Sequence, residues 1–187
     1  MITARTSRET KSYGRRAAAS VVGLLALGLL ATGCSSPEKE YATPSSLCDV
    51  SVPPDLLDPF LPAGKKLSSV PKNDVQGITR CRLVVDEKTV VSASTEWYEK
   101  TLREVAGAPY NEVELDSTTT PDKRYIYAVK GGIGLVDCQD PKRPDQRLIA
   151  SVRVTQGAKD ETRMKELITA FTEGVAGSAE CERRRLG

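Results

Sequence analysis

The sequence predicts an α+β domain in which an antiparallel sheet of about five to six strands carries a long C-terminal helix on one face, with two disulfides. Three observations predict this fold. Strand-like segments follow one another through the middle of the chain, short turns join them, and the clearest helical pattern comes last. Strands in succession with short connections favour antiparallel pairing.

The expected strands are runs rich in β-branched and aromatic residues that end at turn residues. Asp86, Glu87 and Lys88 make a tight connection between the first two runs. The glycine-rich residues 130–134 (KGGIG) form a turn or a bulge between two strands, because a phosphate-binding loop would need a helix directly after them. The expected strands cover residues 78–85, 89–95, 110–116, 125–130, 133–138 and 147–155.

Helices are expected near both ends of the domain and once between strands. A proline pair suits the first turn of a short helix at residues 53–60. Ser94 or Thr95 caps a helix over residues 96–106. The closing helix spans residues 160–176, and its apolar residues repeat at intervals of three and four, which predicts one buried stripe. The stripe consists of Met164, Leu167, Ile168, Phe171 and Val175.

The first 34 residues are built like an export signal. Five basic residues and one acid precede residues 17–32, an uncharged run shorter than the roughly 20 residues of a membrane-spanning helix. The tetrad at 31–34 (ATGC), preceded by Leu30, resembles the lipobox of bacterial lipoproteins. This resemblance implies cleavage after Gly33 and a diacylglycerol thioether on Cys34, which anchors the chain at the extracytoplasmic face of the membrane. An ordinary cleavable signal is the alternative, and a pair of arginines leaves both the general and the twin-arginine export routes open.

The signal at residues 1–33 sets how the rest of the chain is divided. We expect a lipidated cysteine and a flexible Ser/Pro-rich tether at 34–47, one globular domain at 48–181 and a basic tail at 182–187. The signal holds five of the 27 basic residues and one of the 25 acidic residues, which leaves 22 and 24 and a net charge of −2. A mature chain with this charge predicts no nucleic-acid partner.

Four cysteines remain once Cys34 carries lipid. An even number in an oxidising compartment predicts two disulfides, for which three pairings exist. We favour Cys48–Cys81 and Cys138–Cys181, because each joins neighbours in sequence and clips a helix-like segment to a strand-like one. Their spacing excludes a structural zinc site, since no two lie within the C-x₂₋₄-C distance of such sites.

The chain contains no histidine. Its absence removes Ser-His-Asp and Cys-His catalysis and every histidine-containing metal site. Ser69-Val70-Pro71-Lys72 matches the S-x-x-K motif of penicillin-binding proteins and serine β-lactamases, but Pro71 disfavours the helical turn that sets the lysine beside the serine. We therefore predict no catalytic residue and no cofactor, and an enzyme here would depend on carboxylates whose spacing selects no pair.

Two groups of side chains are weak candidates for binding. Glu112, Glu114 and Asp116 alternate along an expected strand and share one face, where hard oxygens can bind Ca²⁺ or a cationic partner. The alternative is a solvated strand face that resists edge-to-edge association. Five aromatic residues could line a concave surface for a peptide, sugar or apolar ligand, with core packing as the default. They are Trp97, Tyr98, Tyr110, Tyr125 and Tyr127.

Beyond the signal, the pattern resembles a large class of actinobacterial lipoproteins of unknown function. The shared features are Cys48-Asp49, a leucine pair after Pro54-Asp55, and Cys81-Arg82. The resemblance implies an extracytoplasmic α+β domain and supplies no catalytic residues. We expect a lipid-anchored, non-catalytic binding or accessory module at the cell envelope with an unknown protein or small-molecule partner. An inhibitor or regulator of an envelope enzyme and a carboxylate-dependent hydrolase are the alternatives.

Overall fold

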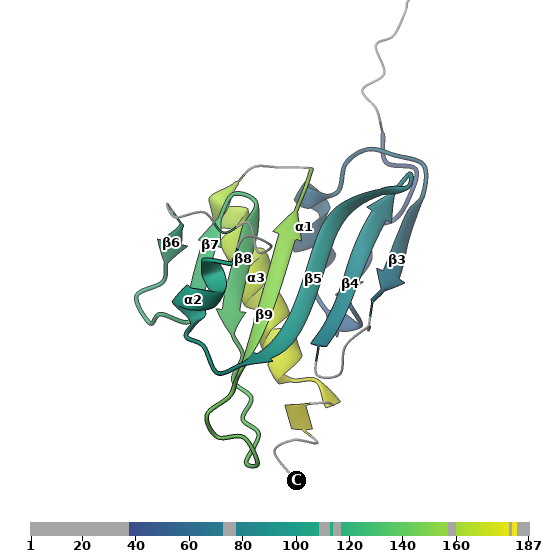
Figure 1. The fold of residues 1–187 in the computed structure, drawn as a ribbon. Coiled ribbons are helices and arrows are strands. Elements are labelled where there is room, and N and C mark those ends of the chain that lie inside the picture. The colour runs from purple at the N-terminus through teal and green to yellow at the C-terminus, as the bar shows by residue number, and fades with distance from the viewer. Residues whose placement is uncertain are drawn as a thin grey trace, which may run out of the picture. The chain divides into compact units, whose positions relative to one another are not determined.

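The computed structural model describes residues 38–72, 78–108, 113, 117–156, 160–179 and 181–182. A seven-stranded antiparallel sheet, in the order β3-β4-β5-β9-β8-β7-β6, carries a long helix along one face (Figure 1). The predicted fold class is confirmed, with more strands than expected. The elements are β1 (Ser46–Leu47), β2 (Val50–Ser51), α1 (Pro54–Leu57), the 3₁₀ turn η1 (Asp58–Phe60), β3 (Leu67–Pro71), β4 (Ile78–Val85), β5 (Lys88–Tyr98), α2 (Leu102–Ala106), β6 (Thr118–Thr119), β7 (Tyr125–Ala128), β8 (Gly131–Leu135), β9 (Arg147–Val154) and α3 (Glu161–Ala176).

Strands β4 and β5 form the tight hairpin that the sequence predicts. Its turn residues Asp86 and Glu87 have φ angles of 46° and 70°. Positive φ at both positions is typical of the mirror-image turn whose twist matches that of paired strands. The Asp86 carboxylate also accepts hydrogen bonds from the backbone N–H groups of Lys65 and Lys66, which lower its pKa. The hairpin turn therefore also fixes the chain that leads into β3.

The helix expected over residues 96–106 is wrong in its first half. β5 continues to Tyr98 because it pairs with β9 along its whole second half. α2 begins only after Thr101, so neither of the two expected caps serves it. The Thr101 hydroxyl accepts a hydrogen bond from the Glu104 N–H over 3.3 Å, and the Glu104 carboxylate accepts one from the Thr101 N–H over 2.8 Å. This reciprocal capping box starts the helix at the observed position.

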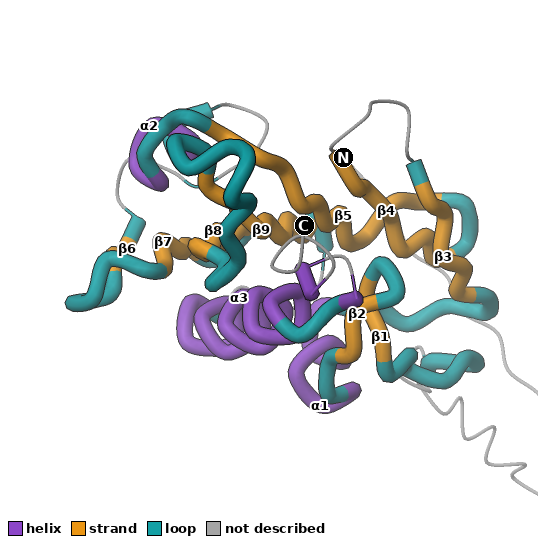
Figure 2. Tube along the Cα trace, turned by 90° about the horizontal axis from the view of Figure 1, so that it is seen from below, coloured by secondary structure: helices purple, strands orange, loops and turns teal. Residues whose placement is uncertain are grey.

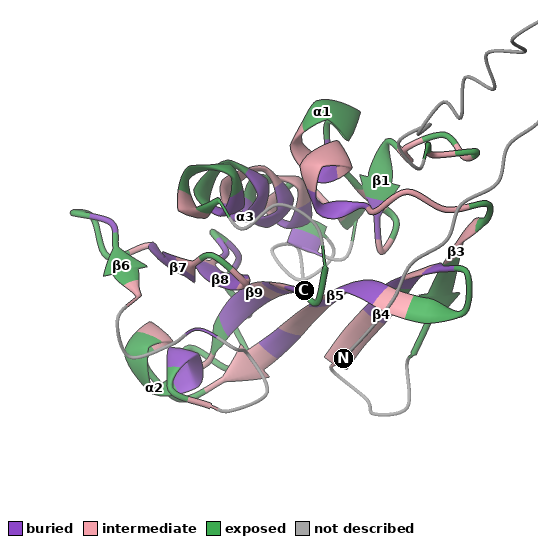
Figure 3. Cartoon of the chain, turned by 90° about the horizontal axis from the view of Figure 1, so that it is seen from above, coloured by how far each residue is buried: buried purple, intermediate pink, exposed green. Residues whose placement is uncertain are grey.

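Helix α3 confirms the predicted C-terminal helix and its buried stripe. The Asp160 carboxylate caps it by accepting hydrogen bonds from the N–H groups of Thr162 and Arg163 over 2.9 and 3.2 Å. The helix turns its buried side toward the sheet, and the buried residues are the purple parts of the α3 ribbon in Figure 3. Each member of the stripe is at most 4% exposed, and Thr172 joins it at 1%. The stripe consists of Met164, Leu167, Ile168, Phe171 and Val175.

The hairpin expected around residues 130–134 is present, but its turn lies at Val129 and Lys130, and Gly131–Gly134 are strand residues rather than a turn or bulge. A Cβ atom on Gly132 would lie 2.9 Å from Cβ of Ile168, and one on Gly134 would lie 2.1 Å from Oγ1 of Thr172. Helix α3 therefore lies closer to β8 than any side chain would allow. The glycines serve this close approach of helix and strand, and the strand starts earlier than its apolar residues indicated.

Residues 39–47 pack on the domain, whereas a flexible tether was expected there. The Lys39 ammonium lies 2.8 Å from the Asp58 carboxylate, and the Thr43 hydroxyl donates to the same group. Hydrogen bonds from Lys39 and then from Thr43 lower the pKa of Asp58. Leu47 is fully buried. The folded part of the chain therefore begins upstream of its expected start.

Both favoured disulfides are present. Cys48–Cys81 joins the turn between β1 and β2 to β4, with the Cα atoms 5.4 Å apart. Cys138–Cys181 joins the β8–β9 connection to the residues after α3, with the Cα atoms 5.7 Å apart. The two bridges fasten the segments at both ends of the domain to its centre.

Candidate functional site

The sheet has one covered face and one partly open face. α1 and α3 lie on the first, and α2 lies on the second over the side of β7, β8 and β9 (Figure 2). The remainder of the second face, over β3, β4 and β5, carries no helix among the described residues, and we call it the open half-face. Under α2 the side chains form a small apolar cluster of Val105, Ala106, Val113, Ile126, Ile133 and Ile149.

A shallow groove of about 420 Å³ lies on the open half-face, and we call it the basic groove. Its cations are Lys72, directly after β3, Arg80 and Arg82 of β4, and Arg153 of β9. Its floor carries the hydroxyl groups of Ser92, Ser94 and Ser151. Glu96 is the one carboxylate among the described residues that line it. Four cations against one anion make this described lining positive, whereas the whole chain has a formal net charge of only +2.

The register of the strands explains the shape of the groove. Ser92 of β5 lies opposite Arg82 of β4 on one side and opposite Arg153 of β9 on the other. Ser94 lies in the next row, between Arg80 and Ser151. Neighbouring strands lie about 4.8 Å apart, so the backbones of the two flanking arginines are about 10 Å apart. Small side chains on the central strand between long ones on its neighbours leave a channel.

Glu96 holds one of the cations in place. It is 6% exposed, and its carboxylate accepts hydrogen bonds from Nε of Arg80 over 2.9 Å, from Nη2 of the same side chain and from the Tyr98 hydroxyl. Two N–H groups on one carboxylate orient the plane of the guanidinium, so Arg80 is fixed before any ligand arrives. The sequence prediction missed this group because it placed Glu96 in a helix. The available signal was that the polar residues Ser92, Ser94 and Glu96 alternate along residues 91–97 (VSASTEW), as on a strand with one polar face.

The serines give the floor both donors and acceptors. The hydroxyl oxygens of Ser94 and Ser151 are 2.8 Å apart and share a hydrogen bond across two strands. Each hydroxyl has one proton and two lone pairs, so each retains capacity for a further hydrogen bond. Cations at the walls and hydroxyls on the floor can bind an anionic group that also carries hydroxyls.

The first three residues of the S-x-x-K segment belong to strand β3 and Lys72 directly follows them, so the segment is not helical. Residues three apart on a strand point to opposite faces, so Ser69 and Lys72 do not meet, which agrees with the dismissal of this motif. The Lys72 N–H donates to the Arg80 carbonyl of β4. Because successive N–H groups along a strand point in opposite directions, the backbone nitrogen of Pro71 faces away from β4, at the outer edge of the sheet. A missing N–H there costs no hydrogen bond and makes the edge a poorer template for another strand.

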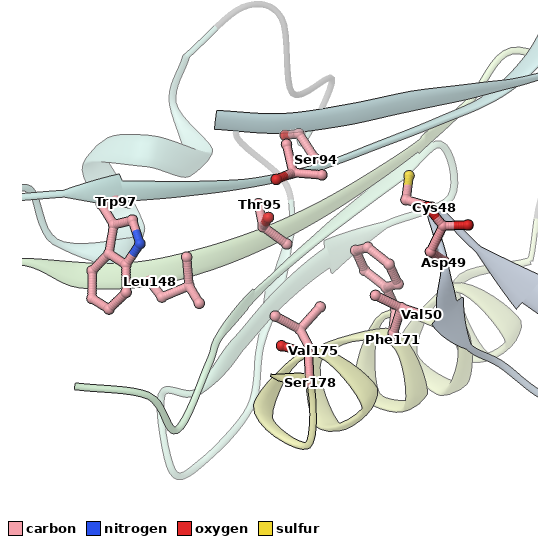
Figure 4. Close-up of a pocket in the computed structure, with 11 residues that line it drawn as sticks. Cys48, Asp49, Val50, Ser94, Thr95, Trp97, Leu148, Phe171, Val175 and Ser178 are labelled. Carbon is pink, nitrogen blue, oxygen red and sulfur yellow. The ribbon is translucent and has the colours of Figure 1, made fainter. Parts of the chain in front are cut away.

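The covered face contains a second, smaller concavity of about 160 Å³. It lies between the β1–β2 hairpin, the sheet and the end of α3, and Figure 4 shows Phe171 and Val175 reaching from the helix toward it. Trp97 and Leu148 close it on the sheet side. Pockets for drug-sized ligands measure about 300–1,000 Å³, so this one has room only for a very small apolar molecule. We do not assign it a function.

The aromatic residues do not gather on one concave surface. Trp97 lines the small apolar pocket, whereas Tyr98 lies on the opposite face of β5 beside Glu96. Tyr125 and Tyr127 are buried in the core, and burial raises the pKa of Tyr125. Tyr110 lies outside the described residues. Core and sheet packing, the default expectation, therefore holds for the tyrosines of β7.

Several predicted sites lie outside the described residues. These are the cleavage and lipidation residues Gly33 and Cys34 and the acidic row Glu112, Glu114 and Asp116. Within the described part of the chain, no group of three or more acidic or cysteine side chains could hold a metal ion. No helix in that part is long and apolar enough to cross a membrane.

Comparison of the chain with protein-family models, with curated proteins and with solved structures finds no match. The basic groove is therefore interpreted from its own residues and geometry.

Proposed function

We propose that the protein is a non-catalytic binding module, held at the extracytoplasmic face of the membrane by lipid on Cys34, and that the basic groove is its binding surface. The observation that carries the proposal is the arrangement of Arg80 and Glu96. Glu96 is buried while the Arg80 side chain is 43% exposed, and an ion pair that buries a carboxylate is a weak source of stability, because desolvation offsets most of the attraction. Its effect here is to hold a cation in one orientation beside three other cations.

The export signal supports the location. A basic segment, an apolar run and the ATGC tetrad occur in the order that lipoprotein export requires. Two or more acyl chains make a stable anchor, whereas a single chain is marginal. The two disulfides suit the oxidising side of the membrane.

The alternatives have less support. An enzyme regulator would present an exposed apolar patch, but the large apolar side chains exposed in the described residues are Val70 and Val129, on different parts of the sheet. A carboxylate-dependent hydrolase needs two carboxylates at its cleft, and the described lining of the basic groove holds one, Glu96.

Two experiments test the proposal. Cys34→Ala should release the protein from the membrane fraction, and a variant that stays membrane-bound after a carbonate wash would contradict the anchor. For the groove, detergent-solubilised full-length protein is used to capture envelope material. Ser92→Trp fills the floor and should abolish capture, whereas Thr162→Trp, on the exposed side of α3, is the matched control. Equal capture by both variants would refute the groove as the binding surface.

A further inference from the structure

We infer that the basic groove binds a phosphodiester-linked polyol chain, an inference that rests on the proposed function. The groove offers two positions for anionic groups in successive rows of the sheet. In the first row, Arg82 and Arg153 flank Ser92. In the second row, Lys72 and Arg80 lie side by side next to Ser94. The first position combines two cations with a hydroxyl, whereas in the second both cations lie on the β4 side of Ser94 and Glu96 offsets the charge of Arg80. Each position therefore keeps a net positive charge beside a hydroxyl, which matches the charge and the acceptor oxygens of a phosphate.

The spacing of the rows sets the repeat of the ligand. Ser92 and Ser94 are two residues apart on one strand, so the two positions lie about 7 Å apart. Two phosphorus atoms joined through a three-carbon polyol are separated by six bonds, as are alternate Cα atoms of a peptide, and such a link spans about 7 Å when extended. A three-carbon polyol phosphate therefore places consecutive phosphates over consecutive rows.

The floor of the groove selects a hydroxyl-rich chain over the other polyanions. Its described lining contains serines and no aromatic side chain, so nucleic-acid bases would find no stacking surface. An acidic peptide can have the same charge repeat, but protein interfaces depend on aromatic and arginine anchors seated in pockets, and this lining offers no apolar pocket. Hydroxyls at Ser94 and Ser151 can instead bond to the polyol between phosphates.

The fixed position of Arg80 argues against a membrane surface as the ligand. Phospholipid headgroups attract long cations that protrude toward a plane. Here the Arg80 side chain is 43% exposed, but its guanidinium is held against the Glu96 carboxylate within the groove and does not protrude from it. A narrow chain can reach it there.

The test uses full-length lipidated protein in non-ionic detergent and a short synthetic glycerol phosphate oligomer, with binding measured by calorimetry at about 50 mM and about 200 mM salt. The groove variant is Arg82→Gln/Arg153→Gln. The matched control is Lys142→Gln/Arg143→Gln, which removes the same charge from the exposed β8–β9 connection. Circular dichroism and thermal melts of all three proteins check that the sheet is intact.

We expect the groove variant to bind the oligomer at least tenfold more weakly at low salt, because it loses two charge-assisted contacts. The slope of log affinity against log salt should fall by about 1.4, while the control stays within about twofold of the wild type. Equal weakening in both variants, or no binding by the wild type, overturns the inference. Tighter binding of polyglutamate of equal charge would assign the groove to an acidic peptide. Inorganic phosphate that binds as tightly as the oligomer would show that a single phosphate suffices, and would overturn the inference of a linked chain. Displacement of the oligomer by phosphatidylglycerol added to the micelles would assign the groove to the membrane.

The inference and the proposed function can fail separately. If the oligomer does not bind but Ser92→Trp still abolishes the capture of envelope material, the groove remains the binding surface and only its ligand class is wrong. If neither result is obtained, the groove itself is not the binding surface.

Discussion

Helix α3 rests on strand β8 at two glycines, and adding one methyl group there perturbs the centre of the fold. In Gly134→Ala, the new Cβ would lie 2.1 Å from Oγ1 and 3.0 Å from Cγ2 of Thr172, and 3.0 Å from Cδ1 of Tyr125. The Thr172 side chain is 1% exposed, and its hydroxyl donates to the Ile168 carbonyl over 2.6 Å. The methyl group is therefore confined from two sides, and either the helix or the side chain must shift.

We expect Gly134→Ala to lower the free energy of unfolding by about 2–3 kcal/mol, in the upper part of the range for overpacked cores. The gain of about 0.5–1 kcal/mol from replacing glycine inside a strand offsets only part of the clash. For a domain of this size the melting temperature should fall by roughly 5–10 °C. Urea unfolding followed by circular dichroism measures the free energy directly.

A double-mutant cycle with Thr172→Ala identifies the cause. Thr172→Ala alone is destabilising, because it removes a buried methyl group and a hydroxyl. The double variant should be more stable than the sum of the single effects predicts, by at least about 1 kcal/mol, because the new methyl occupies the vacated space. Gly177→Ala is the control, since its Cβ would meet nothing nearer than 3.7 Å. The proposed close approach is refuted if Gly134→Ala is as harmless as Gly177→Ala.

Three further predictions concern the disulfides and the ionisable groups. Replacing Cys48 and Cys81 together with serine should lower the free energy of unfolding by up to about 4 kcal/mol, because the bridge spans 33 residues; a urea titration that shows no change would contradict this. The pKa of Asp58 is lowered, chiefly by a hydrogen bond from Lys39, so its stabilisation is present above pH 3.8 and is lost as the pH falls through the lower folded value. Asp58→Asn should therefore reduce the stability gap between neutral and acidic pH, whereas an unchanged gap in acid titrations would contradict it. Burial raises the pKa of Tyr125, so the stability that its neutral side chain contributes is present below pH 10.0 and is lost as the pH rises through the raised value. Tyr125→Phe should therefore reduce the loss of stability at alkaline pH, measured by thermal melts at increasing pH.

Local sequence patterns predicted the elements in which the spacing of apolar residues shows which side is buried. The strand at Ile78–Val85 and the stripe of α3 appear where the sequence places them, because alternation and three-four spacing report directly on which side is buried. The disulfide pairing also followed from order along the chain. For the strand and the helix, the residues that decide the structure lie close together in sequence, whereas the paired cysteines are 33 and 43 residues apart and were favoured only as neighbours in cysteine order.

Elements that depend on a distant partner could not be predicted in this way. Residues 96–98 were expected to begin the helix over residues 96–106. They belong to a strand instead, because pairing with β9 satisfies their backbone groups. Gly132 and Gly134 look like turn residues because nothing nearby in sequence shows that α3 will lie against them. The basic groove is a case of the same kind, because its cations come from β4, from β9 and from the residue after β3, which are brought together only by strand pairing.

The sequence by itself determined the fold class and the absence of histidine chemistry, since these depend on composition and periodicity, and it favoured the observed cysteine pairs among three possible pairings. It also contains the tetrad ending in Cys34, on which the proposed anchor depends. Only the tertiary structure decided where binding groups meet. Strand register puts Ser92 between Arg82 and Arg153, and the burial of Glu96 orients Arg80, through contacts between residues far apart in the chain. The physical reason is that charge and hydrogen-bonding capacity belong to single residues, whereas a binding surface exists only once pairing and packing have brought those residues together.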